Sequence, residues 1–383
     1  MASIPSIAMI PSGYKATKIY SVLPVDGGAD LTFSRPGVGD AGVANRVASN
    51  GLIEEMATDV PRLDYSDGGC PSLLLEPQST NLITYSEEFD NVAWSKSNIT
   101  ITANQAISPK GDLTADLWTA TGASFPQLVE SVSGLTIGND YTISIYVKAD
   151  AGTQVEQRFF VSGFAGVNFT PTNDWQRITY TFKATSTTHT IVLATDSSSS
   201  TLTSYYIWGA QLEEQSYATS YIPTSGALGT RIAETCSKSG LGSYINSSEG
   251  VLYAEMSALA NDGTTRAISV DNGSSSVGAT IRFRPTANEF QFLLKDGVNP
   301  DVGNTLILSD ATQTNKFALK WKSGDIALWV NGVEELTASG TMNISGLTDL
   351  SFSTFGSFYG KVKDLRVYKS ALTDAELQTL TTL

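Results

Sequence analysis

The alternation that governs this chain is clearest in Tyr141-Thr142-Ile143-Ser144-Ile145-Tyr146-Val147, where one Tyr, two Ile and the Val fall on one face. Successive side chains of a β-strand point to opposite faces of a sheet, so this stretch predicts a strand with one face in a core. Ile178, Tyr180 and Phe182 alternate with threonines in the same way. Short strands of this kind, separated by turn clusters, predict an antiparallel β-sandwich over residues 84–225. Its expected strands are 98–103, 127–131, 141–148, 154–161, 175–183, 188–194 and 203–212.

A second alternating region follows in residues 249–383. Asn331-Gly332 comes directly after an apolar run and is the strongest hairpin signal in the chain, because a type I′ turn needs positive φ at both positions. Near the end, Thr373 and Glu376 predict a capping box that begins one short helix. The expected strands of this second sandwich are 250–256, 268–270, 280–284, 290–295, 305–309, 315–321, 325–330 and 361–368.

Three segments are expected to lie outside the two sandwiches. Residues 59–83 carry three prolines, which exclude a central strand or a helix interior, so we expect an extended strap across the 84–225 module. Residues 1–58 contain too few apolar runs to fold alone, and we expect an arm that pairs with a neighbouring copy or docks onto a larger assembly. The alternative is that this arm wraps the 84–225 module. Residues 226–248 are rich in Gly and Ser and predict a semi-flexible linker.

The charge of the chain restricts its partners. Lys and Arg number 24 against 38 Asp and Glu, which gives a net charge of −14. Proteins that bind nucleic acid present a basic face, and anionic membranes attract Lys and Arg, so neither partner is expected. No stretch reaches the about 18 apolar residues of a membrane-spanning helix, and the first residues lack the pattern of a secretory signal.

The cysteines and the histidine point away from nucleophilic catalysis. Cys70 and Cys236 are too few for a disulfide framework and too far apart for a metal cluster. We expect two free thiols, at least one of them buried, with a single long-range bridge as the alternative. The only histidine, His189, lies among threonines and is expected to be a half-exposed strand residue. No serine lies in a G-x-S-x-G elbow that such a histidine would serve.

Carboxylates that adjoin in sequence do not by themselves make a hydrolytic site. The adjacent pairs are Glu54-Glu55, Glu87-Glu88, Glu213-Glu214 and Glu334-Glu335. Neighbours on a strand point to opposite faces, whereas glycoside hydrolysis uses two carboxylates about 5–10 Å apart on one surface. We therefore expect no enzyme activity. A structural calcium ion is the one cofactor kept open, because sandwich loops supply oxygen ligands; Asp90, Asp112 and Asp116 are scattered candidates, and no metal ligands are assigned.

Glycan binding needs exposed aromatic rings beside a few polar groups, because the C–H face of a sugar stacks on a ring while its hydroxyls form hydrogen bonds. Three tryptophans in alternating strands are expected in the cores: Trp175, Trp208 and Trp329. Trp118 is the best candidate for an exposed ring, although core and platform both stay open for it. Phe125, a few residues later, and Phe164, in a Gly-flanked loop, complete the candidate glycan-binding set.

Several strings of the N-terminal part stand out: Ser34-Arg35, Arg46-Val47, Gly51-Leu52-Ile53-Glu54 and the text of residues 61–85. Together they resemble the N-terminal region of bacteriophage fibre and spike proteins. The resemblance implies a structural protein at the virion surface. Residues 1–58 would then anchor it to other capsid or tail proteins, and a homotrimer is the expected assembly.

Two further resemblances cover the sandwiches. The strings at 141–148, 174–177, 207–213 and 221–224 resemble jelly-roll carbohydrate-binding modules, and those at 321–322, 328–332, 360–368 and 371–376 resemble the concanavalin A-like (laminin-G-like) lectin fold. The expected fold class is all-β: two tandem antiparallel β-sandwiches, a jelly roll and then a concanavalin A-like sandwich, preceded by an extended β-rich arm. The implied function is attachment to bacterial surface glycans. A ligand-free decoration or spacer protein and a polysaccharide depolymerase are the alternatives, because one fold hosts many functions.

Overall fold

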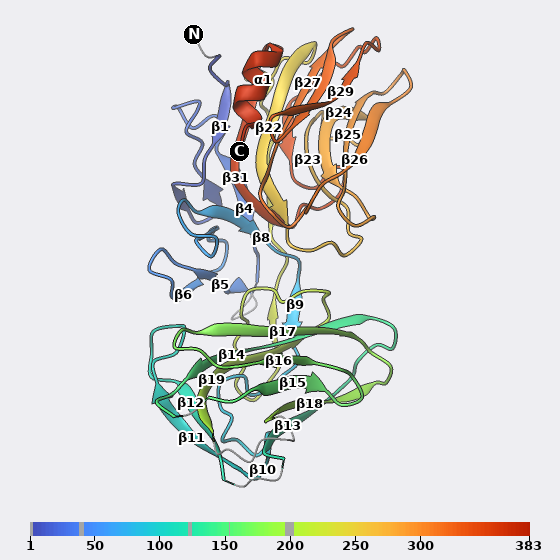
Figure 1. Cartoon of the computed structure of the whole chain (residues 1–383). Helices are drawn as coiled ribbons and strands as arrows, with labels where there is room; N and C mark the ends of the chain where they lie inside the picture. The colour runs from blue at the N-terminus through green and yellow to red at the C-terminus, as the bar shows by residue number, and fades with distance from the viewer. Residues whose placement is uncertain (1–2, 38–41, 122–124, 153, 196–202) are drawn as a thin grey trace. The chain divides into compact units, whose positions relative to one another are not determined.

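The computed structural model describes residues 3–37, 42–121, 125–152, 154–195 and 203–383, and these residues form β-strands and one short helix (Figure 1). The all-β prediction is confirmed. The chain divides into two units. Unit 1 comprises Met1–Pro36, Met56–Pro77 and Ala233–Leu383, and unit 2 comprises Gly37–Glu55 and Gln78–Ile232. The sandwiches are therefore not simply consecutive, because unit 1 is assembled from three separate segments.

Unit 2 is a sandwich of two five-stranded antiparallel sheets. One sheet has the order β10 (Ser95–Ser97), β13 (Gln127–Ser133), β18 (Thr188–Thr195), β15 (Gln157–Val161) and β16 (Val167–Phe169). The other has the order β11 (Ile99–Ala106), β12 (Ala115–Ala120), β19 (Ser204–Glu213), β14 (Asp140–Ala149) and β17 (Gln176–Lys183). Two short pairs complete the unit: β5 (Ala44–Val47) with β6 (Ile53–Met56), and β9 (Ser79–Asn81) with β20 (Gly229–Arg231).

The core of unit 2 is built by the alternation read from the sequence. On β14, Tyr141, Ile143, Ile145 and Val147 are buried in one cluster with inward-facing residues of both sheets. Phe182 of β17 joins the same cluster. Burial of such side chains contributes about 1.5–3 kcal/mol each, so the cluster supplies the main favourable term for this unit.

Unit 1 has an eight-stranded and a nine-stranded antiparallel sheet. The first follows the order β29 (Val333–Ala338), β28 (Ile326–Val330), β27 (Asn315–Lys322), β22 (Glu249–Ala258), β31 (Gly360–Tyr368), β8 (Ser72–Leu75) and β7 (Arg62–Asp64), with β1 (Ile7–Met9) also paired to β31. The second follows the order β2 (Tyr14–Lys15), β3 (Lys18–Ile19), β4 (Leu31–Ser34), β21 (Thr235–Lys238), β30 (Asp349–Ser351), β23 (Arg266–Asp271), β24 (Val277–Phe283), β25 (Glu289–Asp296) and β26 (Val302–Ile307).

Both local signals read from the end of the sequence are confirmed. Asn331 and Gly332 have φ values of 50° and 86°, and they join β28 to β29 as a two-residue hairpin loop. Thr373 and Glu376 form the capping box of α1 (Asp374–Thr381). Leu377 of this helix packs on residues of β22, β27 and β28. Among the described residues, no helix is long and apolar enough to span a membrane.

The expected arm, strap and linker are instead parts of folded sheets. In unit 1, β1 and β8 both pair with β31, so the part of the strap up to Pro77 belongs to unit 1 and not to the 84–225 module as predicted. The rest of the strap, residues 78–83, does pack on that module, where the N–H of Leu82 donates to the carbonyl oxygen of Leu212. β4 pairs with β21, which lies in the expected linker. These segments contain short strands whose backbone N–H and C=O groups form hydrogen bonds within a sheet. The pattern of apolar residues alone does not predict these hydrogen bonds.

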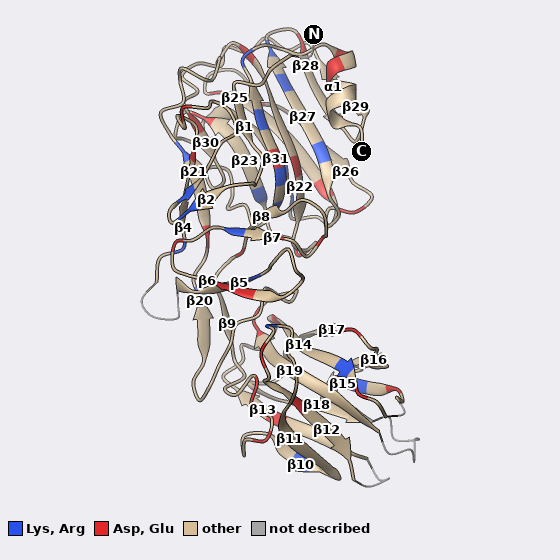
Figure 2. Cartoon of the chain, turned by 90° about the vertical axis from the view of Figure 1, so that its left-hand side faces the viewer, with Lys and Arg blue, Asp and Glu red and all other residues tan. Residues whose placement is uncertain are grey.

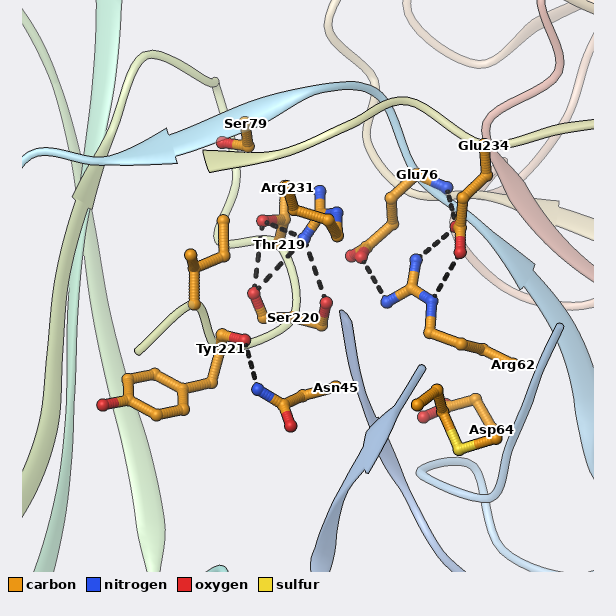
Figure 3. Close-up of polar contacts among 12 residues, drawn as sticks. Asn45, Arg62, Asp64, Glu76, Ser79, Thr219, Ser220, Tyr221, Arg231 and Glu234 are labelled. Carbon is orange, nitrogen blue, oxygen red and sulfur yellow. Dashed lines mark hydrogen bonds and ion pairs between the residues drawn. The ribbon is translucent and has the colours of Figure 1, made fainter. Parts of the chain in front are cut away.

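A buried cluster of charges joins the three segments of unit 1 (Figure 3). Arg62 forms ion pairs with Glu76, at 2.7 Å, and with Glu234. Arg35 pairs with the same Glu234 at 2.6 Å and also donates to the backbone carbonyl of Ala57 at 2.7 Å. The two Arg and two Glu balance in charge, so their burial leaves no uncompensated ion.

The two thiols form no disulfide, and the histidine is bonded to the backbone. Cys70 is exposed, Cys236 is buried and both are free, as expected. Burial raises the pKa of the Cys236 thiol. His189 is buried rather than half-exposed, which corrects the prediction. Its Nε2 accepts hydrogen bonds from the backbone N–H groups of Thr185, at 3.1 Å, and Ser186, at 3.2 Å.

Candidate functional site

The aromatic residue favoured from the sequence is not on the surface. Trp118 lies on β12 and is 0% exposed, and its ring stacks on that of Tyr205 with the centroids 4.9 Å apart. Of the two interpretations left open, the core position is correct, and the expected exposed ring at Trp118 is wrong. β12 alternates in burial, and the position of Trp118 faces inward between the two sheets.

The two phenylalanines have different environments. Phe125 is 41% exposed, with its backbone in the left-handed region at φ 49°. Phe164 is half-buried and packs against Phe182 and His189, with centroid distances of 5.2 and 5.4 Å. Of the three predicted glycan-binding residues, only Phe125 therefore offers a largely exposed ring.

The remaining tryptophans do not supply an open platform either. Trp94, Trp208, Trp321 and Trp329 are buried, as expected for Trp208 and Trp329. Trp175 is half-buried, and its Nε1 donates to the carbonyl oxygen of Ile107 at 3.1 Å. A sugar site in this chain must accordingly rely on polar groups more than on a tryptophan face.

Unit 2 contains a cavity of about 280 Å³ that has such polar groups, which we call the acidic cavity. Three stretches of unit 2 line it: the β5–β6 hairpin, the residues after β9, and the segment that leads into β20. The lining residues are Val43, Ala44, Asn45, Glu55, Glu87, Glu88, Tyr221, Ile222, Pro223, Thr224, Ser225, Gly229 and Thr230. None of these described lining residues is a Lys or an Arg.

The rule that strand neighbours point to opposite faces predicts that Glu87 and Glu88 do not act as a pair. In the structure these two residues follow β9 in a bend and not in a strand, so both line the acidic cavity. Glu54 and Glu55 do lie on strand β6 and behave as predicted. Glu55 lines the cavity, while Glu54 accepts a hydrogen bond from Arg46 at 2.9 Å.

Hydrogen bonds within unit 2 fix the wall of the acidic cavity. The Tyr221 hydroxyl donates to Glu87 Oε1 at 2.8 Å, and the Ser225 hydroxyl donates to Glu88 Oε1 at 2.8 Å. Asn45 Nδ2 donates to the backbone oxygen of Tyr221 at 2.9 Å (Figure 3). These contacts hold the carboxylates in place. They also use the donor groups of Tyr221, Ser225 and Asn45, which are then not free to bond a ligand.

Two polar atoms of the wall lack such partners among the described residues. Thr224 is only 7% exposed and its Oγ1 has no hydrogen-bond partner. Glu88 Oε2 is likewise buried without a partner. A buried polar group without a hydrogen bond costs about 1–3 kcal/mol, so these atoms gain from a ligand group that forms a hydrogen bond with them.

Burial controls the electrostatics of the cavity. It raises the pKa of Glu87 above the ordinary value, against the hydrogen bond from Tyr221 and the positive charge of Lys110. The charges of Asp112 and Glu88 add to the rise. Glu87 is therefore easier to protonate than an ordinary glutamate, and a bound cation would favour its charged form.

The candidate calcium ligands do not come together. No group of three or more His, Cys, Asp or Glu in the described part of the chain is arranged to hold a metal ion. Asp116 accepts from the backbone N–H groups of Phe89 and Asn104, and burial raises its pKa to about 6. Asp112 accepts from the hydroxyls of Ser108 and Thr114. These two carboxylates thus serve the local backbone and turns.

Unit 1 has a cavity of about 390 Å³ beside α1, lined in part by Arg366, Tyr368 and Glu376. Its charged groups are already paired: Arg366 Nε donates to Asp364 at 3.0 Å, and Glu376 accepts from Thr373 in the capping box. Charged residues of both signs lie along the neighbouring strands β22, β27 and β31 (Figure 2). The acidic cavity of unit 2 is the better candidate because polar atoms of its wall remain unpaired.

The fold of unit 1 has known relatives. Residues 251–378 match the family described as the Concanavalin A-like lectin/glucanases superfamily. Unit 1 contains a concanavalin A-like domain. The predicted lectin-like fold of the C-terminal part is thereby confirmed, whereas the family includes both lectins and glucanases and leaves the activity open. No curated protein matches the chain.

Solved structures with similar parts share little sequence. A leech intramolecular trans-sialidase is 19% identical over 36% of this chain and 24% of its own, with a TM-score of 0.29. The binding domain of botulinum neurotoxin DC is 14% identical over 39% of each chain, with a TM-score of 0.31. The NanB sialidase of Streptococcus pneumoniae is 15% identical over 38% of this chain and 26% of its own, with a TM-score of 0.33. This chain thus spans less than half the length of each of these proteins, and no functional conclusion follows from these likenesses.

Proposed function

We propose that this protein is a non-enzymatic glycan-binding subunit on the surface of a bacteriophage virion, and that the acidic cavity of unit 2 is its sugar site. The observation that carries the proposal is this cavity with unpaired polar atoms, in a β-sandwich on the same chain as a concanavalin A-like domain. Its volume of about 280 Å³ is near the lower end of the about 300–1,000 Å³ of small-molecule sites. A single sugar unit at the end or side of a glycan suits a site of this size.

The virion assignment is supported by the resemblance of the N-terminal strings to phage fibre and spike proteins. Attachment to other virion proteins through residues 1–58, and assembly as a homotrimer, belong to the same proposal. Because β1 to β4 are strands of unit 1, the anchoring surface would be a folded sheet and not a free arm. Repeated copies would make a weak site effective, since linked sites raise the effective concentration. No metal or other cofactor is assigned a role.

A glycan array probed with the full-length chain tests glycan binding. We expect binding to a subset of bacterial glycans, and loss of that binding in Glu88→Gln. The matched control is Glu335→Gln on the exposed edge strand β29 of unit 1, which should bind as the wild type does. Absence of binding to every glycan would favour a ligand-free spacer protein and contradict the proposal. Immuno-electron microscopy of virions tests the location, and labelling absent from the particle surface would contradict that part.

One observation favours a second candidate function, a polysaccharide depolymerase. Glycoside hydrolysis uses one carboxyl group with a raised pKa as acid and a second carboxylate nearby. Glu87 has a raised pKa and shares the acidic cavity with Glu88 and Glu55. Incubation of the purified chain with capsule or exopolysaccharide distinguishes the two functions. Release of reducing ends that Glu87→Gln abolishes would replace the binding proposal with this one.

A further inference from the structure

The wall of the acidic cavity consists largely of hydrogen-bond acceptors. Three carboxylates face it, from Glu55, Glu87 and Glu88. Three side-chain donors beside them bond within the protein: Tyr221 to Glu87, Ser225 to Glu88, and the Asn45 amide to a backbone oxygen. The hydroxyl of Thr224, which can donate as well as accept, has no partner among the described residues. The hydroxyls of Thr80 and Thr230 likewise bond each other at 2.8 Å. A ligand that contacts the carboxylates must therefore bring donors of its own.

The charge of the cavity wall also favours a ligand that brings hydrogen-bond donors, because it favours a cation. Three carboxylates with no Lys or Arg among the described lining residues create a negative potential in a partly enclosed space. Low-dielectric walls strengthen such a field, which attracts cations and repels anions. Uronic acids, sialic acids and phosphorylated sugars are thus disfavoured, although they are common in bacterial surface polymers.

A metal ion would satisfy the charge but does not fit the geometry. The carboxylates of the cavity are not grouped closely enough for a metal, as no cluster of three acidic or other ligating residues is found in the described chain. An organic cation spreads its charge over several donors and can reach separate acceptors. The unpaired Oγ1 of Thr224 and Oε2 of Glu88 offer two such acceptors on one wall.

We propose that the acidic cavity binds a hexosamine unit with a free amine, whose ammonium group contacts Glu88 and Glu87 and whose hydroxyls donate to Thr224 and Glu55. This inference rests on the proposed glycan binding and narrows it to de-N-acetylated amino sugars. An ammonium group supplies three N–H donors and one positive charge, which matches the acceptor-rich wall. An N-acetyl group removes that charge and adds an acetyl group that the cavity must also hold.

Isothermal titration of the full-length chain tests the inference with two matched probes, β-1,4-linked tetraglucosamine and tetra-N-acetylglucosamine. We expect the free-amine oligomer to bind at least about tenfold more tightly, which corresponds to about 1.4 kcal/mol. Glu88→Gln should weaken its binding about tenfold, and Thr224→Val should weaken it several-fold. Glu335→Gln should leave it unchanged. Circular dichroism and the melting temperature of each variant establish that it folds.

The outcomes separate this inference from the proposed function. Equal or tighter binding of the N-acetylated oligomer would overturn the amino-sugar inference, while glycan binding itself would stand. Binding of a lysine-containing peptide as tightly as tetraglucosamine, with the same dependence on Glu88, would overturn it in favour of a protein partner. No binding of either oligomer, combined with a positive glycan array, would also reject the inference alone. Failure of the array would reject both.

Discussion

Arg62 and Glu234 are 172 positions apart in sequence, yet their side chains form a buried two-point ion pair with Nε and Oε1 2.8 Å apart. Glu76 and Arg35 complete the cluster. Burial alone would lower the pKa of Arg62, but the negative charges of Glu234 and Glu76 overcome it and raise the pKa. The pair links two of the three segments from which unit 1 is assembled, Met56–Pro77 and Ala233–Leu383.

Removing the charge of Glu234 should destabilise unit 1 strongly. Glu234→Gln removes the carboxylate that pairs with both Arg35 and Arg62, and breaking a buried pair typically costs about 3–5 kcal/mol. The free energy of unfolding in urea measures the effect. The matched control is Glu54→Gln, which breaks a partly exposed pair with Arg46 and should cost about 1 kcal/mol or less. Similar small losses for both variants would contradict this role of the cluster.

The buried carboxyl of Glu130 should make unit 2 less stable as pH rises. Glu130 is 6% exposed on β13, and burial raises its pKa from 4.5 to about 7, against a hydrogen bond from the backbone of Thr84. Between these values the folded state holds a proton that the unfolded chain releases, so stability is highest at low pH and falls as pH rises to about 7. The full shift corresponds to roughly 3 kcal/mol.

Urea unfolding at about pH 5 and about pH 8 tests this linkage. Glu130→Gln keeps the shape of the side chain without its ionisation, and it should therefore be more stable than the wild type at the higher pH. Glu335→Gln is the control and should keep the wild-type pH dependence. An identical pH slope in wild type and Glu130→Gln would show that Glu130 does not titrate in this range.

Binding of a cationic sugar should weaken as the medium becomes acidic. Glu87 must be ionised to attract an ammonium group, and its pKa is raised by burial, so protonation removes the attraction as pH falls through that value. The groups that act on Glu87 are Tyr221, Lys110, Asp112 and Glu88. The Tyr221 hydroxyl stabilises the charged form, and Tyr221→Phe should shift the loss of binding to higher pH. Titrations of tetraglucosamine across the acidic range measure the midpoint; Tyr20→Phe, on an exposed tyrosine of unit 1, should leave it in place.

Substitution of Trp118 should lower the stability of the protein much more than substitution of Phe125. Trp118→Ala removes a fully buried ring between the sheets and should cost about 3–5 kcal/mol of unfolding free energy. Phe125→Ala removes a largely exposed ring and should change stability by about 0.5 kcal/mol or less. Equal effects of the two substitutions in urea unfolding would contradict these placements.

The strands with a long alternating run could be predicted from the sequence, whereas β12 could not. β14 alternates apolar residues with polar ones except at Tyr146, and both its existence and its core-facing residues were predicted. β12 places Asp116 at a buried position, where it accepts two backbone N–H groups, so the apolar pattern is interrupted and the strand was missed. Without that strand, the sequence could not decide between a core and a surface position for Trp118.

The acidic cavity could not be predicted from the sequence, for a different reason. Its carboxylates come from Glu55 on a short hairpin and from Glu87 and Glu88 in a bend, and Tyr221 comes from more than a hundred residues later. The rule that neighbouring side chains point to opposite faces holds only within strands. The sequence pattern of residues 84–90 does not reveal that this segment is not a strand. The dense run of polar residues after β9 was the one available signal.

The location of a bound sugar tests the account most directly. A crystal structure of the full-length chain soaked with tetraglucosamine should show a sugar unit in the acidic cavity, with its amine within hydrogen-bond distance of Glu88 and a hydroxyl at Thr224. A sugar bound in the concanavalin A-like domain or at Phe125, with the acidic cavity empty, would contradict it.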